Sequence, residues 1–326
     1  MPNDRRSFLG QSVAMGLMPF IPKNMKFDEK DLQNMSLNEI PKGRNKVGFN
    51  LLLWTASISD KMNAVSEKLK NMGYDGVEVS MGELQPQPYL DFGKHLKSID
   101  MEVTSIYAGG KEDDPINESP IVRQKALDKL KWVIDRSNDM GSHLICGPVH
   151  SAFGYFRKRP PTTEEYKWSA EVLYKAGEYA AKANTIFAVE ALNRFECYLC
   201  NTVSQLSTLI QMTDHPNIKP MYDTHHANIE EKKNTEAISS LKGKLAHVHI
   251  SENDRGTPGD GHINWNDIFS SLAKINYNGW LTIESFSRGD PSFSDAINVW
   301  REFSPTWDVP VNGLKLIRSM QNKYNL

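Results

Sequence analysis

Cysteine is scarce in this chain of 326 residues, which contains only Cys146, Cys197 and Cys200. An odd number of cysteines in a large chain makes a disulfide framework unexpected. Cys197 and Cys200 have CxxC spacing, but neither a second pair nor a basic neighbourhood accompanies them. We therefore interpret them as a structural pair beside a loop, with zinc binding or redox chemistry as the alternative.

Long apolar runs and an excess of one charge are also missing. Outside the N-terminal segment, no stretch approaches the roughly 18 apolar residues that a membrane-spanning helix needs, so we expect no membrane span. The 38 basic and 40 acidic residues nearly balance, and the basic ones are scattered. Nucleic acid is therefore not an expected partner. Seven Trp, 13 Phe and 39% hydrophobic residues supply a packed core and predict a globular protein.

The first 45 residues differ from the rest of the chain. Arg5 and Arg6 are followed by Ser-Phe-Leu and a weakly apolar stretch, a pattern typical of a twin-arginine export signal. The apolar part is short and no Ala-x-Ala cleavage site follows, so an ordinary disordered tail is the alternative. We predict a signal-like segment and polar linker over 1–45, one domain over 46–326, and a periplasmic or exported protein. Without a working signal the protein would be cytoplasmic.

Beyond Lys46, short β-rich runs alternate with segments of helical period. Apolar residues recur at helical spacing in 60–72 and 122–140. Strand followed by helix, repeated eight times, predicts an α/β fold, a single (β/α)8 TIM barrel. An open doubly wound sheet is the competitor, but no GxGxxG follows the first strand and the chain contains no GxxxxGK[ST]. The expected strands are 47–53, 75–80, 102–108, 142–147, 185–192, 218–223, 245–251 and 279–285.

One stretch, LAHVHISENDRGTPGDGHINW (245–265), combines an alternating strand with a charged, glycine-rich loop. The period of two places His247 and His249 on the same face of the strand. The loop that follows carries several charged side chains, Arg255 among them. This pattern is typical of the mouth of an active site, and a solvated surface loop is the alternative.

Four successive expected strands end in residues that can bind metal: Glu190, Asp223, His249 and Glu284. Reactive residues of a barrel collect at this end of the strands. A single carboxylate there is often a helix cap, but three converging in a partly dry pocket are unfavourable without a cation. Carboxylates with one imidazole suit Mn²⁺, Co²⁺ or Mg²⁺, and catalytic Zn²⁺ stays open.

Several motifs occur together in an order that resembles the ketose 3-epimerases. These enzymes include D-tagatose 3-epimerase and D-psicose 3-epimerase, of the xylose-isomerase-like barrel superfamily. The resemblance covers about 46–305 and is most specific after Thr185. Its segments are AVEALNRFE (188–196), YDTHHANIEE (222–231), HVHISENDRGTPGDG (247–261) and IESF (283–286) with NVWRE (298–302).

The resemblance implies a role for each matched residue. His247 would be a supporting residue, His225 replaces a usually apolar residue, and Phe153 stands where tryptophan is common. The segment 50–54 also matches less well, so the resemblance does not identify the native sugar. The implied metal ligands are Glu190, Asp223, His249 and Glu284, with Mn²⁺ expected first, and the implied sugar contacts are Glu196, His226 and Arg255.

The implied reaction is the interconversion of ketohexoses at C3. Glu190 and Glu284 would lie on opposite sides of C3, one removing a proton and the other returning one through an enediolate that the metal stabilises. We therefore expect a small-molecule sugar as partner, and a homo-oligomer, either a dimer or a tetramer.

Other functions stay open. A metal-dependent lyase or isomerase acting on 3-keto-glycosides would use the same acidic position beside a ketone. Endonuclease IV-like barrels need more metal-binding histidines and a basic face, and a non-catalytic sugar-binding barrel would not need both Glu190 and Glu284. For Arg255, the alternative is a loop arginine paired with Glu252 or Asp254. His262 has no matched role and is interpreted as a loop residue.

Overall fold

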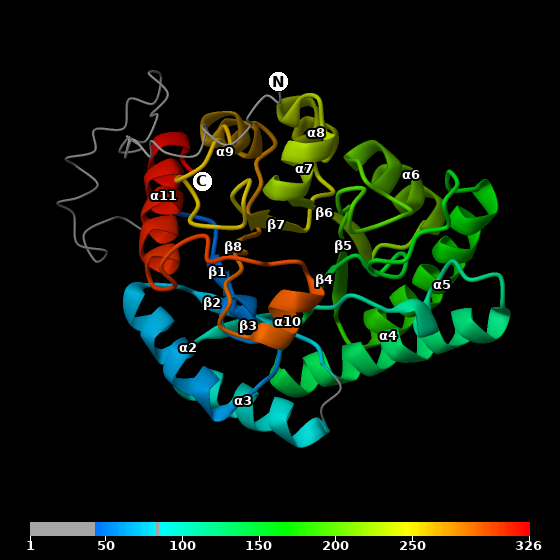
Figure 1. Cartoon of the computed structure of the whole chain (residues 1–326), viewed down its shortest axis with the longest axis horizontal. Helices are drawn as coiled ribbons and strands as arrows, with labels where there is room; N and C mark the ends of the chain where they lie inside the picture. The colour runs from blue at the N-terminus through cyan, green and yellow to red at the C-terminus, as the bar shows by residue number, and fades with distance from the viewer. Residues whose placement is uncertain (1–42, 83–84) are drawn as a thin grey trace, which may run out of the picture. The chain divides into compact units, whose positions relative to one another are not determined.

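The computed structural model describes residues 43–82 and 85–326. Within these ranges, eight parallel strands form a closed barrel in the order of the sequence, and helices surround it (Figure 1). The predicted single (β/α)8 barrel is confirmed. The signal-like segment lies outside the described residues. The strands are β1 (Val47–Asn50), β2 (Gly76–Ser80), β3 (Glu102–Ile106), β4 (Leu144–Gly147), β5 (Ile186–Val189), β6 (Ile218–Asp223), β7 (His247–Ile250) and β8 (Trp280–Ile283).

The two helices predicted from apolar spacing are present in the structure. The expected helix over 60–72 has these bounds in the structure, and the one over 122–140 begins two residues earlier, because Pro120 occupies a first-turn position where a missing N–H costs nothing. The helices are α2 (Asp60–Met72), α3 (Pro86–Ser98), α4 (Pro120–Met140), α5 (Thr163–Lys182), α6 (Val203–Thr213), α7 (Thr224–Glu230), α8 (Asn234–Ser240), α9 (Trp265–Lys274), α10 (Pro291–Ala296) and α11 (Asp308–Tyr324), with 3-10 turns η2 (Leu51–Leu53) and η3 (Lys111–Asp113).

Most strands end earlier than predicted. Leu51–Leu53, expected at the end of the first strand, forms η2 instead. The cause is local: the side-chain oxygen of Asn50 accepts a hydrogen bond from the N–H of Leu52 at 2.9 Å and turns the chain. The barrel is therefore built from short strands, and the residues directly after each strand lie at the carboxyl end of the barrel.

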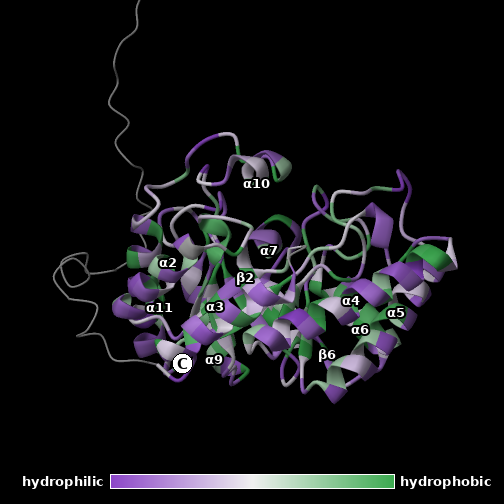
Figure 2. Ribbon diagram, turned by 90° about the horizontal axis from the view of Figure 1, so that it is seen from below, coloured by the Kyte–Doolittle hydropathy of each residue, from purple (hydrophilic) through white to green (hydrophobic). Residues whose placement is uncertain are grey.

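Alternation along each strand separates the barrel interior from the helix layer. In β7, Val248 and Ile250 are fully buried on one side, while His247 and His249 lie on the other and contact Glu78 of β2. Helix surfaces turned to solvent are largely hydrophilic (Figure 2). The predicted placement of both histidines on one face is confirmed, and that face is the interior.

Hydrogen bonds join the segment before β1 to the C-terminal helix α11 and the residues after it. The N–H of Arg44 donates to the carbonyl of Leu326 at 2.7 Å, and Gln321 of α11 donates to the carbonyl of Asn45 at 2.8 Å. The last helix therefore secures the approach to β1. In the part of the chain that the structure describes, every helix is too short or too polar to cross a membrane.

Candidate active site

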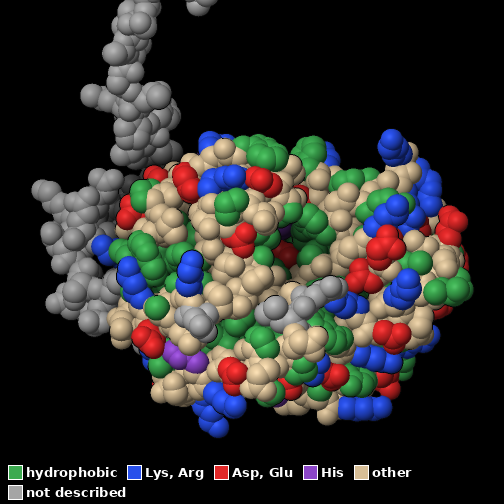
Figure 3. All heavy atoms as spheres, turned by 60° about the horizontal axis from the view of Figure 1, so that its bottom comes forward, with side chains coloured by type: hydrophobic (Ala, Val, Ile, Leu, Met, Phe, Trp, Pro, Cys, Tyr) green, Lys and Arg blue, Asp and Glu red, His purple; other side chains and the backbone are tan. Residues whose placement is uncertain are grey.

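The four predicted metal ligands meet at the carboxyl ends of β5 to β8. Glu190 and Glu284 directly follow β5 and β8, Asp223 ends β6 and His249 is the third residue of β7, and all four are buried. Nδ1 of His249 lies 3.7 Å from Oε1 of Glu190, 3.5 Å from Oδ2 of Asp223 and 3.5 Å from Oε2 of Glu284. Figure 3 shows a hollow in the surface with acidic and histidine side chains at its floor.

Two atoms of this cluster are buried and have no hydrogen-bond partner among the described residues: Oε1 of Glu190 and Nδ1 of His249. Buried polar atoms in folded proteins are nearly always paired. Glu190, Asp223 and His249 each offer a ligand atom in a group compact enough to hold a metal ion. Three carboxylates and one imidazole fit a divalent cation, so the residues present suit the ion that the sequence predicts.

The electrostatics of the cluster also favour a positive charge. Burial raises the pKa of Glu190 well above its usual range, and the neighbouring Asp223 and Glu284 raise it further, against the opposing effect of His249 and Arg255. Burial alone would lower the pKa of His249, but the surrounding carboxylates, Glu284 foremost, raise it well above its ordinary value. The carboxylates therefore stabilise a cation at this position.

The sequence led us to expect three carboxylates with no positive charge beside them except a metal ion. The structure corrects this, because the guanidinium of Arg255 lies against two of them. The guanidinium donates from Nη1 to Oε2 of Glu284 at 2.7 Å and to Ser251 at 2.8 Å, and lies 3.3 Å from Oδ2 of Asp223. Cζ of Arg255 also lies 4.9 Å from the centroid of the Phe286 ring. Arg255 thus faces the carboxylate cluster rather than the side chains of Glu252 or Asp254.

The loop after β7 that carries Arg255 is organised around the buried carboxylate of Glu252. This carboxylate accepts hydrogen bonds from the N–H groups of Asn253, Gly259 and Ile263 and from the indole of Trp265, at 2.8 to 3.2 Å. His262 is exposed in the same loop, as interpreted from the sequence. Glu252 is therefore a structural centre of the loop.

The three predicted sugar-contact residues lie in one network beside the carboxylates. Nδ1 of His226 lies 3.2 Å from the backbone N and 2.9 Å from the side-chain Nδ2 of Asn193, and this Nδ2 donates to Oε1 of Glu196 at 2.8 Å. Nε2 of His226 lies 2.8 Å from Nη2 of Arg255. His225 is also buried, and its Nδ1 lies 3.1 Å from the carbonyl of Glu252.

Glu78 of β2 is a site residue that sequence reasoning missed. It is fully buried, and its Oε1 lies 2.8 Å from Nε2 of His249. Its Oε2 lies 3.0 Å from Nε2 of His247, so His247 stands behind the cluster, consistent with its predicted supporting role. The signal was present in the sequence, because Glu78 interrupts an apolar strand between Val77 and Val79.

The cysteines have the surroundings of core residues. All three are buried and unpaired, and burial raises the pKa of Cys197 to about 11. The Sγ of Cys197 lies 3.2 Å from the hydroxyl of Ser151. Because a protonated, enclosed thiol is a poor nucleophile and a poor metal ligand, the structural interpretation of the CxxC pair agrees with the geometry.

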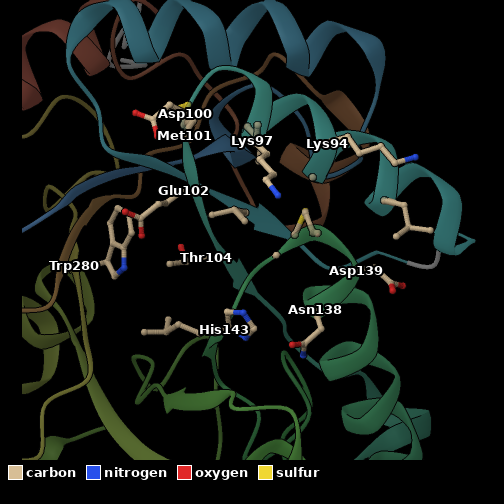
Figure 4. A pocket seen from close by; sticks show the side chains of 17 residues that line it. Lys94, Lys97, Asp100, Met101, Glu102, Thr104, Asn138, Asp139, His143 and Trp280 are labelled. Carbon is tan, nitrogen blue, oxygen red and sulfur yellow. The ribbon is translucent and has the colours of Figure 1, made fainter.

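A second pocket, of about 620 Å³, lies at the amino ends of β3, β4 and β8. Four of its charged groups are already in ion pairs: Lys94 with Asp91, Asp100 with Lys70, Glu102 with Lys46, and Asp139 with Arg136. Active sites of TIM barrels lie at the opposite, carboxyl end of the strands. The carboxylate cluster is therefore the candidate active site. Figure 4 shows the side chains that line the second pocket, among them Lys94, Lys97, Asp139, His143 and Trp280.

Comparison with known proteins agrees with this fold. The family model described as xylose isomerase-like TIM barrel matches residues 66–303, and the chain belongs to this family. The chain is 30% identical over 265 residues to the D-psicose 3-epimerase of Ruminiclostridium cellulolyticum, covering 79% of this chain and 90% of the relative. It is 29% identical over 281 residues to a probable ketose 3-epimerase of a Synechocystis species, covering 84% of this chain and 96% of the relative.

Solved structures give the same result. The structure of an L-ribulose 3-epimerase matches with a TM-score of 0.81 and 27% identity, covering 86% of this chain and 95% of that chain. The resemblance to ketose 3-epimerases is confirmed. The chain is an enzyme of the isomerase class.

Proposed function

We propose that this enzyme is a metal-dependent ketose 3-epimerase that interconverts ketohexoses at C3. The observation that carries the proposal is the cluster at His249, whose unpartnered Nδ1 faces three buried carboxylate oxygens at 3.5 to 3.7 Å. The relatives support the reaction class, because their names describe 3-epimerases acting on ketoses.

Glu190, Asp223, His249 and Glu284 would hold the ion. Mn²⁺ is our first candidate, and Co²⁺, Mg²⁺ and Zn²⁺ are alternatives, because oxygen-rich ligand sets with an imidazole accept all of them. When bound, a divalent ion acts as a Lewis acid that stabilises negative charge on the ketone oxygen of the sugar.

The sugar would be held by Glu196, His226 and Arg255. Asn193 presents two N–H donors to Nδ1 of His226, so this nitrogen accepts and Nε2 carries the hydrogen. That N–H then faces a guanidinium donor of Arg255 at 2.8 Å. Two donors facing each other lack an acceptor, and an oxygen of a bound sugar could accept from both. This arrangement of donors supports a binding position for a sugar oxygen beside His226 and Arg255.

The proton would move between two carboxylates. Oε1 of Glu190 has no hydrogen-bond partner among the described residues and lies 3.7 Å from Nδ1 of His249, so this oxygen is available to accept a proton from a bound sugar. Glu284 is held on both sides, by Arg255 at Oε2 and by Asn50 at 3.2 Å from Oε1. Glu190 would remove the C3 proton and Glu284 would return one to the opposite face, with the roles exchanged in the reverse direction.

Isotope incorporation tests this function. The Mn²⁺-loaded enzyme, incubated in D₂O with a panel of ketohexoses, should give an epimer with deuterium at C3, because carboxylates exchange their protons with solvent. Hydride return through a bound nicotinamide would leave C3 unlabelled and would contradict the two-carboxylate proposal. The same panel should include 3-keto-glycosides, since release of an aglycone or an unsaturated sugar would support the lyase alternative instead.

A further inference from the structure

We infer that Glu78 is the positioning residue of the metal site: it holds His249 in the tautomer and orientation that present Nδ1 to the ion. This inference rests on the proposed metal site and adds a residue that is itself not a ligand. Glu78 contacts Nε2 of His249, on the opposite side of the imidazole from the carboxylates.

Neighbouring strands hold the Glu78 carboxylate in place. Asn50 of β1 and Thr104 of β3 are its register partners, and both donate to it. Nδ2 of Asn50 lies 3.0 Å from Oε1, and the hydroxyl of Thr104 lies 2.9 Å from Oε2. Because register partners project to the same side of the sheet, these bonds fix the carboxylate from its two flanks.

Groups across the barrel complete the environment of Glu78. Nε2 of His249 lies 2.8 Å from Oε1, and Sγ of Cys146 donates to Oε2 at 3.2 Å. Oε1 therefore accepts from Asn50 and faces Nε2 of His249, while Oε2 accepts from Thr104 and Cys146 and faces Nε2 of His247 at 3.0 Å. Donors to both oxygens favour the charged form of the carboxylate. Glu78 is consequently an ionised acceptor in a dry interior, where hydrogen bonds to a charged group are strong.

This contact determines which nitrogen of His249 is free. A carboxylate can only accept, so the hydrogen of the imidazole resides on Nε2 and the lone pair of Nδ1 faces the cluster. The opposite tautomer would direct an N–H at the ion and a lone pair at Glu78. Metal-binding histidines commonly have a carboxylate on the second nitrogen, and loss of it typically costs about 10- to 100-fold in metal affinity or activity.

His247 restricts the same ring from the side. Its ring lies edge-on to that of His249, with centroids 5.1 Å apart and an interplanar angle of 79°. Its Nε2 also lies 3.0 Å from Oε2 of Glu78. One carboxylate thus contacts both histidines of β7, and the ring of His249 has little freedom to turn away from the cluster.

Metal affinity tests the inference without relying on activity. Glu78→Gln preserves volume but replaces the charged acceptor with an amide that presents donors to Thr104 and Cys146. The Kd for Mn²⁺, measured by competition with a fluorescent chelator on metal-depleted protein, should rise about 10- to 100-fold. Thr104→Val is the matched control, because it removes a neutral donor to the same carboxylate and should change the Kd less than about threefold.

The possible outcomes separate this inference from the proposed function. Unaltered protein that binds no Mn²⁺ would overturn the metal site and this inference together, whereas a Glu78→Gln variant with unaltered Kd would overturn only the role of Glu78. If this variant does not fold, ¹⁵N-histidine NMR of the unaltered Zn²⁺-loaded protein decides the question. A hydrogen on Nε2 of His249 supports the inference, and a hydrogen on Nδ1 with Nε2 bound to the metal refutes it.

Discussion

At the scale of single residues, the two glutamates proposed to carry the proton have different surroundings. Oε1 of Glu190 has no hydrogen-bond partner among the described residues, and burial raises the pKa of this carboxyl well above its usual range. Glu284 is instead held by Arg255 and Asn50. The two carboxylates are therefore held in position by different neighbours, although both are proposed to transfer a proton at C3.

We predict that Glu190→Gln and Glu284→Gln each lower kcat by about 100-fold or more, the usual scale for removal of an acid–base group. Glutamine preserves volume and one ligand oxygen but has no basic carboxylate. Initial rates at saturating metal and sugar measure the effect. Glu171→Gln on the exposed face of α5 is the control and should retain the rate of the unaltered enzyme.

The strand-end residues could be predicted from the sequence, but part of their surroundings could not. Recognisable strands end at or next to Glu190, Asp223, His249 and Glu284, and a barrel brings all strand ends to one face. The sequence shows Glu78 as a charged residue in an apolar strand, but its partner His249 is 171 positions away, and no local pattern indicates which polar groups meet inside the barrel. The contact of Arg255 with two carboxylates was missed because loop conformation is not encoded in a repeating pattern.

At the scale of elements, the start of α5 is secured by the carboxylate of Glu165. This group accepts from the N–H of Thr162 and from two nitrogens of Arg159, at 2.8 to 3.0 Å. Burial alone would raise the pKa of Glu165, but Arg159 and Thr162 outweigh it and lower the pKa. A lowered pKa in the folded state means that the stabilisation is present above the unfolded-state pKa and is lost as the pH falls.

Glu165→Gln should therefore destabilise the protein by about 1 to 2 kcal/mol at neutral pH, the scale of a lost charge-assisted hydrogen bond. The difference from the unaltered protein should shrink as the pH falls below about 4, where the carboxylate protonates in the unfolded chain. Urea unfolding at several pH values measures it. Glu164→Gln, at the exposed neighbour, should show little difference at any pH, and equal losses in both variants would contradict the assignment.

The loop after β7 is likewise held together by hydrogen bonds to one buried carboxylate, that of Glu252. Glu252→Gln would place an amide donor among four N–H groups, so we predict a loss of about 2 to 3 kcal/mol in unfolding free energy. Hydrogen exchange of the backbone amides of Asn253, Gly259 and Ile263 should become faster, because these three amides lose the charged acceptor that they share. Asp254→Asn is the control, since the carboxylate of Asp254 accepts a single hydrogen bond among the described residues, from the N–H of Gly256. Unchanged exchange in Glu252→Gln would refute this account of the loop.

Element positions were predicted well where a repeating pattern existed. The apolar spacing of 60–72 predicted α2 with its observed bounds, since burial of one helix face imposes that spacing. Leu51–Leu53 was predicted as strand and forms a 3-10 turn, because a single side-chain hydrogen bond from Asn50 overrides the apolar run. A contact of this kind leaves no periodic signal.

At the scale of the whole molecule, the proposed metal site couples ligand binding to stability. Removal of the ion would leave three buried carboxylates repelling one another, with Arg255 and His249 as the nearby positive groups. We predict that chelation abolishes activity, that Mn²⁺ or Co²⁺ restores it, and that thermal stability falls. At free Mn²⁺ 100 times its Kd, the ion should contribute about 2.7 kcal/mol. Thermal unfolding with and without chelator measures this, and full turnover in a preparation shown to be metal-free by elemental analysis would contradict it.

Export and assembly remain predictions from the sequence. If Arg5 and Arg6 form a twin-arginine signal, changing both to Lys should retain the protein in the cytoplasm, because the export machinery recognises the arginine pair. Cell fractionation measures this, and an unaltered chain found wholly with cytoplasmic markers would disprove it. The expected homo-oligomer can be measured on the same purified protein by light scattering.

The hydrogen bond between Arg44 and Leu326 brings the start and the end of the barrel domain together. Each strand pairs with the strands before and after it, β1 pairs with β8, and the two ends of the barrel lie within a hydrogen bond of each other. No βα unit is therefore structurally first. A circularly permuted chain, joined by a short linker between residues 44 and 326 and opened at the turn of Gly141, would have the same neighbours around every strand. We therefore expect the permuted chain to form the same barrel, although its βα units follow one another from a different starting point in the sequence.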